Sequence, residues 1–195
     1  MIAIVDYGSG NVRSVKNTLD FLGAESLITS KPEEIEAADR IIFPGVGAFG
    51  YAMEQLRKRK LEGPVKNSIA NGKPFLGICL GQQLLFEESE ESPGIKGLGI
   101  FKGRVKKFAK GKTPQIGWNR IIPVKKNAFE EGYMYFVNSY YVAPEDSSLI
   151  AAKTSYEGQE FASAIEKDNV TAVQFHAEKS GDFGIDFLRR WLNAR

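Results

Sequence analysis

Strand and helix patterns alternate along the first 86 residues of the chain, and this alternation is the strongest constraint on its fold. Each short apolar run ends at a turn or in a segment with helical spacing, which predicts a strand followed by a helix. The predicted strands are residues 2–6, 26–29, 40–43 and 75–79. The predicted helices are residues 12–22, 32–38, 51–71 (with a break at Gly63-Pro64) and 80–86. This order predicts a mostly parallel sheet with helices on both faces.

Strand patterns dominate the chain beyond residue 99, where the predicted strands are residues 99–108, 115–123, 133–142, 149–155, 161–166 and 170–175. An amphipathic helix with apolar residues between Phe183 and Trp191 follows them. Successive short strands favour antiparallel hairpins appended to the parallel core. The prediction is one α/β domain over residues 1–195, in which an antiparallel strand-rich part extends a mostly parallel central sheet with flanking helices.

The composition is that of an ordinary globular protein and does not indicate binding to nucleic acid or membrane. Apolar residues make up 43%, charged residues 26%, and the formal net charge is +2. No apolar run approaches the roughly 18 residues of a membrane span, and the first six residues lack a secretory pattern. The single cysteine, Cys79, cannot form an internal disulfide, so we expect a reducing, cytoplasmic location. The basic segment 102–112 and the acidic segment 87–91 are expected on solvated surfaces.

Cys79 lies where a predicted strand runs directly into a predicted helix, in the pattern Gly77-x-Cys79-x-Gly81. This is the cysteine form of the nucleophile elbow, in which a strained turn presents a nucleophile above a sheet. Glycines two residues before and after remove side chains that would collide in such a turn. The helix from Leu80 would direct N–H groups and its positive end at the sulfur, which favours the thiolate. The alternative is a buried core cysteine between two packing glycines.

His176 is the only histidine in the chain, and it follows an apolar strand pattern. A thiol nucleophile works best with a base that can also protonate a leaving amine. Glu178 lies two residues further on, and side chains at i and i+2 of an extended segment point to the same side. We therefore predict a catalytic triad of Cys79, His176 and Glu178, in which Glu178 orients the imidazole. A lone histidine is otherwise more often a surface or core residue.

The segment 45–50 matches G-x-G-x-x-G after a predicted strand, which taken literally predicts a dinucleotide site. The match is weak because the strand is the third one, Pro44 opens the segment and no strand-terminal acid follows at about 20 residues. A better use of Gly45, Val46 and Gly47 is to present backbone N–H groups to an oxyanion. No metal or cofactor is expected.

Three motifs occur in the order found in class I (triad-type) glutamine amidotransferases, a family that the chain resembles over essentially its whole length. These motifs are the loop 44–47, the elbow 77–83 and the segment 175–180. The resemblance is closer still to the glutaminase subunits of imidazole glycerol phosphate synthase, through residues 6–11, 117–119 and 135–140. The chain departs from the usual family pattern at Gln82, Gln115, Asn138 and Ala177.

The resemblance implies that Cys79 attacks the side-chain amide of L-glutamine, that His176 carries the proton to departing ammonia, and that Glu178 orients it. It implies that the Leu80 N–H and the loop Gly45 to Gly47 stabilise the oxyanion. Glutamine's amino and carboxylate ends would be held by Gln83, Glu91 and the backbone at Ser139 and Tyr140. Ammonia would pass to a (β/α)8-barrel cyclase subunit, in a heterodimer that makes imidazole glycerol phosphate and an aminoimidazole carboxamide ribotide in histidine biosynthesis. The implied interface positions are Trp118, Asn119, Tyr135 and Lys179.

Two alternatives stay open on the sequence. The glutaminase of pyridoxal phosphate synthase also pairs with a barrel, although segments 6–11 and 117–119 count against it. A regulatory module of the same fold that has lost catalysis is the second alternative, and the intact triad counts against that one.

Overall fold

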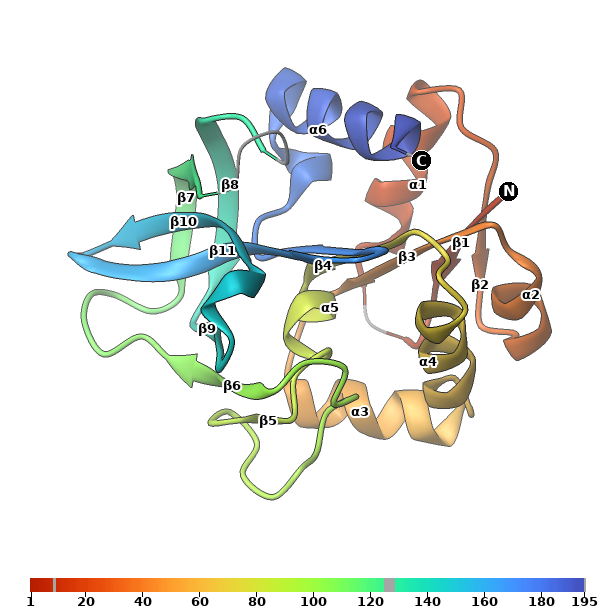
Figure 1. The fold of residues 1–195 in the computed structure, drawn as a ribbon, viewed down its shortest axis with the longest axis horizontal. Coiled ribbons are helices and arrows are strands. Elements are labelled where there is room, and N and C mark those ends of the chain that lie inside the picture. Colours follow the sequence, from red (N-terminus) through yellow and green to blue (C-terminus); the bar gives the residue numbers. More distant parts are fainter. Residues whose placement is uncertain (9, 125–128, 195) are drawn as a thin grey trace.

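One large sheet runs through the computed structural model, which describes residues 1–8, 10–124 and 129–194 (Figure 1). The described residues form a sheet of 12 strands, nine of them in the order β2-β1-β3-β4-β12-β11-β10-β7-β8. The first five of these nine are parallel, and the pairs from β12 to β8 are antiparallel. The mixed α/β fold, with an antiparallel part extending a parallel core, agrees with the prediction from sequence.

The parallel half is built from buried apolar strands, as expected for strands covered by helices on both faces. Its strands are β1 (Ile2–Val5), β2 (Ser26–Thr29), β3 (Arg40–Gly45), β4 (Phe75–Cys79) and β12 (Val170–Val173). Strand β12 comes from near the end of the chain, yet it pairs in parallel with β4, with Val173 opposite Ile78. The site therefore combines segments from both halves of the sequence.

Helices cover the two faces of this half and create two apolar cores. On one face, α2 (Pro32–Ala37), α3 (Phe49–Lys58) and α4 (Glu62–Ala70) pack on alternate strand residues such as Ala3 and Phe43. On the other face, α1 (Val12–Phe21) and α6 (Gly181–Asn193) pack on residues such as Ile4 and Ile78. The alternation of side chains along each strand sends its apolar residues into both cores.

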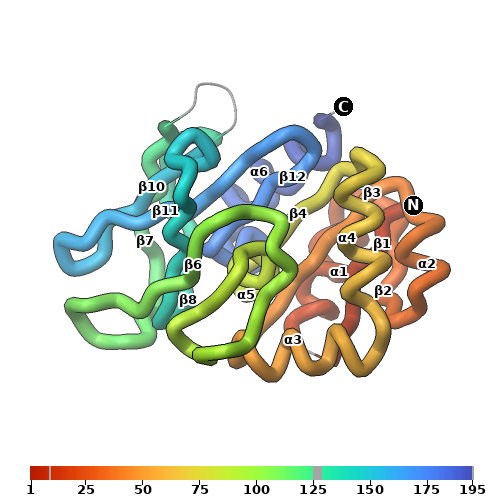
Figure 2. Tube along the Cα trace, turned by 60° about the horizontal axis from the view of Figure 1, so that its bottom comes forward, coloured from red at the N-terminus to blue at the C-terminus, as the bar shows by residue number. Residues whose placement is uncertain are grey.

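The strand-rich part lies beside the helical half, at the left of Figure 2. Its main strands are β11 (Gln159–Lys167), β10 (Ile150–Tyr156), β7 (Gln115–Pro123) and β8 (Gly132–Asn138). A branch is formed by β9 (Tyr140–Pro144), β6 (Gly103–Lys107) and the two-residue strand β5 (Glu88–Ser89), which the sequence did not predict. The short helix α5 (Leu80–Gln83) and two 3-10 helices, η1 (Ser147–Leu149) and η2 (Ala177–Lys179), complete the elements of the described residues.

Two predicted helices differ from the observed ones. The break expected at Gly63-Pro64 falls instead between α3 and α4, where Lys60 adopts a positive φ of 59°. Pro64 is tolerated in the first turn of α4 because no N–H is needed there. The helix expected over 80–86 ends early, since α5 covers only Leu80–Gln83. The chain then turns, and the Leu84 and Leu85 carbonyls accept hydrogen bonds from the segment 98–101 instead of continuing a helix.

Several predicted strands also have different limits. The strand expected over 133–142 is two strands, β8 and β9, which separate at Ser139 because β8 pairs with β7 whereas β9 pairs with β6 and β11. The strand expected from residue 99 begins at Gly103. The strand expected over 170–175 ends at Val173, so that the three residues before Ala177 form a connection rather than a strand.

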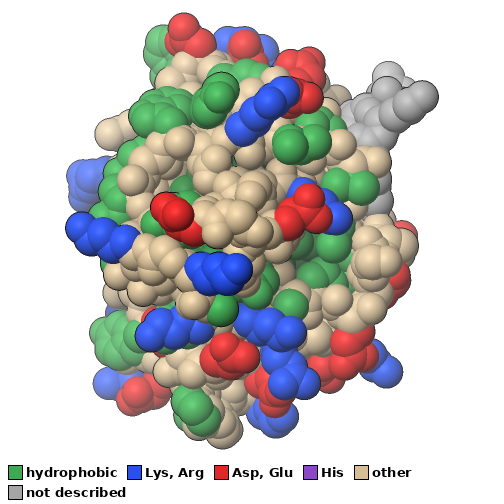
Figure 3. All heavy atoms as spheres, turned by 90° about the vertical axis from the view of Figure 1, so that its left-hand side faces the viewer, with side chains coloured by type: hydrophobic (Ala, Val, Ile, Leu, Met, Phe, Trp, Pro, Cys, Tyr) green, Lys and Arg blue, Asp and Glu red, His purple; other side chains and the backbone are tan. Residues whose placement is uncertain are grey.

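Lys and Arg side chains are interspersed with Asp and Glu on the face formed by the strand-rich end (Figure 3). Along β6, exposed Arg104 alternates with buried Gly103 and Val105, as expected for a strand with one solvated face. In the acidic segment, however, Ser89 is buried and Glu91 reaches α3, so this segment is only partly a solvated loop. Among the described residues, no helix has the length and apolar character needed to cross a membrane.

Candidate active site

Cys79 ends β4 and adopts a strained backbone conformation, with φ 54° and ψ −112°. Such values are rare for a residue with a side chain and are typical of a nucleophile elbow. The glycine at position 81 is required by close packing, because a Cβ there would lie 1.8 Å from the Phe43 carbonyl oxygen on β3. A Cβ at Gly77 would lie 3.2 Å from the Gln82 nitrogen across the turn. The expected collision thus involves the neighbouring strand as well as the turn itself.

His176 reaches the elbow because β12 lies beside β4. Its backbone N–H donates to the Tyr135 carbonyl at 2.9 Å, and its side chain is 2% exposed. His176 Nδ1 lies 2.8 Å from Glu178 Oε1, and the Glu178 side chain is fully buried. The structure brings the two side chains together, but not for the reason expected from the sequence. Glu178 lies in the 3-10 turn η2 rather than in an extended segment.

The environment of His176 favours the imidazolium. Burial by itself would lower the pKa of His176, but the Cys79 sulfur and the Glu178 carboxylate outweigh burial and raise that pKa to about 10. An imidazole that holds its proton beside a sulfur can stabilise a thiolate. This arrangement can supply a nucleophile and a proton donor at the same place.

Asn11 contacts the buried carboxylate and was not among the predicted site residues. Its Nδ2 donates to Glu178 Oε1 at 2.5 Å and lies 3.3 Å from His176 Nδ1. Asn11 precedes α1 and adopts a left-handed conformation with φ 78°, and its side chain does not cap the helix. The only sequence signal for this position was its place in the motif at residues 6–11. A left-handed asparagine at a functional site is a recognisable feature once the structure is known.

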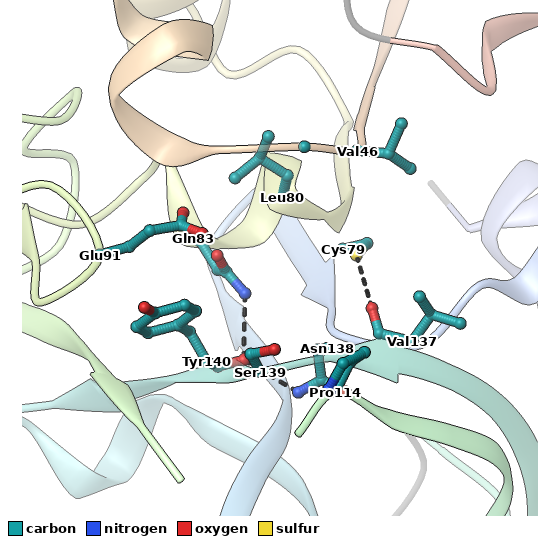
Figure 4. Close-up of a pocket in the computed structure, with 11 residues that line it drawn as sticks. Val46, Cys79, Leu80, Gln83, Glu91, Pro114, Val137, Asn138, Ser139 and Tyr140 are labelled. Carbon is teal, nitrogen blue, oxygen red and sulfur yellow. Dashed lines mark hydrogen bonds between the residues drawn. The ribbon is translucent and has the colours of Figure 1, made fainter. Parts of the chain in front are cut away.

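A cavity of about 330 Å³ opens at Cys79, between the elbow and the β8–β9 connection (Figure 4). All four residues predicted to hold glutamine line it: Gln83, Glu91, Ser139 and Tyr140. The Cys79 sulfur lies at the cavity wall, 4.0 Å from the Val137 carbonyl oxygen. The cavity is large enough for an amino acid, and its reactive group is at one side.

The predicted oxyanion residues lie near the sulfur but not all on the cavity. Val46, Gly47 and Leu80 line it, whereas Gly45 is buried in β3 opposite Cys79. Gly47 has a positive φ of 100°, which a glycine adopts without strain.

The dinucleotide interpretation of segment 45–50 is disfavoured by the start of α3. Glu91 Oε2 accepts a hydrogen bond from the Phe49 N–H at 2.7 Å, and Ser92 Oγ accepts one from the Gly50 N–H at 3.0 Å. A dinucleotide pyrophosphate would need these N–H groups and would be repelled by the carboxylate. The helix N-terminus is therefore already occupied by groups of the chain itself.

Two of the predicted interface residues form an aromatic pair on an exposed sheet face. Trp118 on β7 lies opposite Tyr135 on β8, with ring centroids 6.1 Å apart, and Trp118 is 55% exposed. Lys179 is exposed in η2, one residue after Glu178. Asn119 instead turns its amide toward the Ser155 carbonyl at 3.0 Å. Further exposed apolar side chains on the same two strands are Ile116, Ile122, Tyr133 and Val137.

Of the departures from the usual family pattern, Asn138 lines the cavity, and Gln82, Gln115 and Ala177 are buried. Gln115 on β7 lies opposite Asn138 on β8, and its Nε2 donates to Asn138 Oδ1 at 2.8 Å. Two of the unusual residues are therefore hydrogen-bonded to each other in the buried interior. Asn138 Nδ2 in turn donates to the Tyr140 carbonyl at 2.9 Å. Ala177 is fully buried between His176 and Glu178.

Comparison with known proteins shows a family match along almost the whole chain. Residues 3–193 match the family model described as glutamine amidotransferase class-I. The chain is 50% identical to a protein of Methanothermobacter thermautotrophicus named imidazole glycerol phosphate synthase subunit HisH, over 98% of each chain. A protein of the same name from Pyrococcus furiosus is 49% identical over 97% of each chain. A solved structure titled crystal structure of glutamine amidotransferase has the same fold, with TM-score 0.80 and 20% identity over 99% of this chain and 98% of that one.

Proposed function

The chain belongs to the class I glutamine amidotransferases, and we propose that it is the glutaminase subunit of an imidazole glycerol phosphate synthase. Relatives that are 43–50% identical over nearly their whole length carry that subunit name, which supports this assignment over the glutaminase of pyridoxal phosphate synthase. The observation that carries the activity is that Cys79, at the wall of a cavity of amino-acid size, is hydrogen-bonded to buried His176, which Glu178 contacts in turn.

In the proposed reaction, the Cys79 thiolate attacks the side-chain amide carbon of L-glutamine. A C–S bond forms, and the carbonyl oxygen becomes an oxyanion, to which N–H groups at Leu80 and the loop 45–47 would donate. The C–N bond then breaks while His176 gives its proton to the departing nitrogen, which leaves as ammonia. Glu178 holds the imidazole in orientation throughout.

Water completes the cycle by attacking the glutamyl thioester. It gives one proton to His176, and the C–S bond breaks with its electron pair returning to sulfur. The new carboxylic acid loses its proton to solvent, glutamate leaves, and the thiolate–imidazolium pair is restored. Gln83, Glu91, Ser139 and Tyr140 line the cavity, which supports their proposed role in holding the amino and carboxylate ends of glutamine. A thiolate that must stay reduced also supports a cytoplasmic location.

The proposed partner is a (β/α)8-barrel cyclase subunit that receives the ammonia. The exposed apolar face of β7 and β8, next to the triad, supports docking there, because solvent-exposed aromatic clusters are typical of interfaces. We expect Trp118→Ala to weaken binding to the barrel subunit by about 30-fold or more in calorimetry. Tyr51→Ala is the matched control, since Tyr51 is 56% exposed but lies on α3, away from this face (Figure 1). Equal effects of the two substitutions would argue against this docking face.

The decisive test is glutamate release by the complex with the barrel subunit, with and without the ribotide substrate. We expect Cys79→Ser to lower the rate by at least about 10³-fold. Glutamate release that survives the substitution would refute the mechanism. Absence of activity in the unaltered complex would support a regulatory module instead.

A further inference from the structure

Gln174 is fully buried directly beneath the nucleophile, in the connection that joins β12 to His176. Its backbone N–H donates to the Ser163 carbonyl at 2.9 Å, which continues the pairing of the chain with β11 beyond the end of β12. Val173, the last residue of β12, lies opposite Ile78 in parallel register. The residues that follow these two, Gln174 and Cys79, are therefore also opposite each other. The side chain of Gln174 therefore meets the base of the elbow.

Two hydrogen bonds hold the Gln174 amide. Its Nε2 donates to Cys79 Sγ at 3.5 Å, and its Oε1 accepts from Gln83 Nε2 at 2.9 Å. The same Gln83 nitrogen donates its other hydrogen to the Tyr140 carbonyl at 3.1 Å. A series of hydrogen-bonded side-chain amides thus connects Tyr140, at the wall of the cavity, with the Cys79 sulfur.

The direction of the hydrogen bonds between these amides is set at the Tyr140 carbonyl. A backbone carbonyl can only accept, so the Tyr140 oxygen requires the nitrogen of Gln83 on that side. Gln83 then has only an N–H to offer to Gln174, which must accept with Oε1. The remaining end of the Gln174 amide is a nitrogen, and it points at the sulfur. Cys79 is thereby supplied with a donor whose orientation is set by a backbone group.

We propose that Gln174 is a further catalytic residue, whose side-chain N–H stabilises the Cys79 thiolate. This inference rests on the proposed glutaminase function. A hydrogen bond from a neutral donor to an anion is stronger than one between neutral groups, and burial removes competing water. The imidazolium of His176 also stabilises the thiolate, but it gives its proton away when ammonia leaves.

The two donors therefore act at different moments. His176 is neutral when water attacks the thioester, and it becomes charged only as it takes the proton of that water. The C–S bond then breaks, and sulfur leaves with the electron pair. Gln174 carries no proton that the reaction consumes, so its N–H faces the sulfur in every step. It can stabilise the developing thiolate before His176 is fully charged.

The experiment measures alkylation of Cys79 by iodoacetamide as a function of pH, in the full-length chain. The chain has a single cysteine, so mass spectrometry reports one site. Gln174→Met is close in shape and removes both the donor and the acceptor. Gln174→Glu still accepts from Gln83 but places an oxygen at the sulfur. We expect alkylation at neutral pH to fall about tenfold in Gln174→Met and at least as much in Gln174→Glu, with the half-maximal rate shifted to higher pH.

Gln82→Met is the matched control, because Gln82 is equally buried and donates to the Ala172 carbonyl at 3.2 Å rather than to sulfur. Its alkylation profile is expected to stay unchanged. An unchanged profile in a folded Gln174→Met or Gln174→Glu protein, judged by circular dichroism, would overturn the inference. If neither variant folds, NMR spectroscopy of the unaltered protein tests the contact between Gln174 and Cys79. The Gln174 side-chain amide resonance should shift when Cys79 is alkylated, and a resonance that does not move would refute the contact.

The outcome is separable from that of the proposed function. Alkylation needs no glutamine and no partner subunit. A complex that lacks glutaminase activity would refute the function whatever the alkylation profiles show. An active complex in which the Gln174 variants alkylate normally would refute this inference alone.

Discussion

His176 Nδ1 lies 2.8 Å from Glu178 Oε1, although the two residues are joined by a 3-10 turn and not by a strand. The turn brings the carboxylate to the Nδ1 edge of the ring, and Ala177 between them is buried. Ser180 stabilises this arrangement by donating from Oγ to the His176 carbonyl at 2.6 Å and accepting from the Tyr135 N–H at 2.9 Å. The geometry of the pair is therefore set by local backbone contacts with β8 as well as by the pair itself.

Glu178→Gln should lower the glutaminase rate by about 10²–10⁴-fold while the fold is retained. The amide is similar in size, but it removes the charge that stabilises the imidazolium and can offer an N–H that favours the wrong tautomer. Glu160→Gln is the control, because it removes a surface ion pair with Lys153 that contributes at most about 1 kcal/mol. Steady-state glutamate release measures both, and a Glu178→Gln enzyme with native activity would contradict the orienting role.

Asn11→Gly and Asn11→Ala should separate the side chain of Asn11 from its backbone conformation. Both remove the hydrogen bond to Glu178, so both should lower the glutaminase rate, by about tenfold. Only alanine is strained at a φ of 78°, so Asn11→Ala should also be less stable than Asn11→Gly by about 1 kcal/mol. Thermal unfolding and activity assays test the two effects. Native activity in the glycine variant would show that the amide is dispensable.

The raised pKa of His176 predicts a loss of stability at high pH. The pKa of His176 is 6.5 in the unfolded chain and about 10 in the folded chain, so the folded chain binds this proton more tightly. The stabilisation is therefore fully present below pH 6.5 and is lost as the pH rises through about 10. Urea titrations should show the free energy of unfolding falling across this window. The fall should be smaller in Cys79→Ala, which removes one cause of the shift, and identical pH dependence of the two proteins would contradict the assignment.

Gly81→Ala should destabilise the chain by at least about 3 kcal/mol, because the new methyl group would overlap the Phe43 carbonyl on β3. Gly63→Ala is the matched control. Gly63 lies in the first turn of α4, has no positive φ and has open space around its Cβ position, so alanine there should be neutral or stabilising by up to about 1 kcal/mol. Chemical denaturation compares them. A Gly81→Ala protein of native stability would mean that β3 and the elbow can separate without cost.

Much of the fold and part of the site could be predicted because they depend on short stretches of chain. The strand at 75–79, the strained elbow and the alternation of the first half follow from local apolar periodicity and from glycines at the two required positions. The limits of the elements were less predictable. The helix after the elbow ends at Gln83, and β8 separates from β9 at Ser139, because distant strands take the hydrogen bonds.

The sequence by itself determined the elbow, the identity of the only available histidine and the mixed α/β architecture. Tertiary structure alone decided that β12 pairs with β4, and with that pairing came the contacts of Gln174 with Cys79 and of Asn11 with Glu178. The residues of these contacts are 95 and 167 positions apart in the chain. The physical reason is that local patterns set the conformation of a segment, whereas the partner of a segment depends on how the whole chain buries its apolar surface and satisfies its backbone hydrogen bonds.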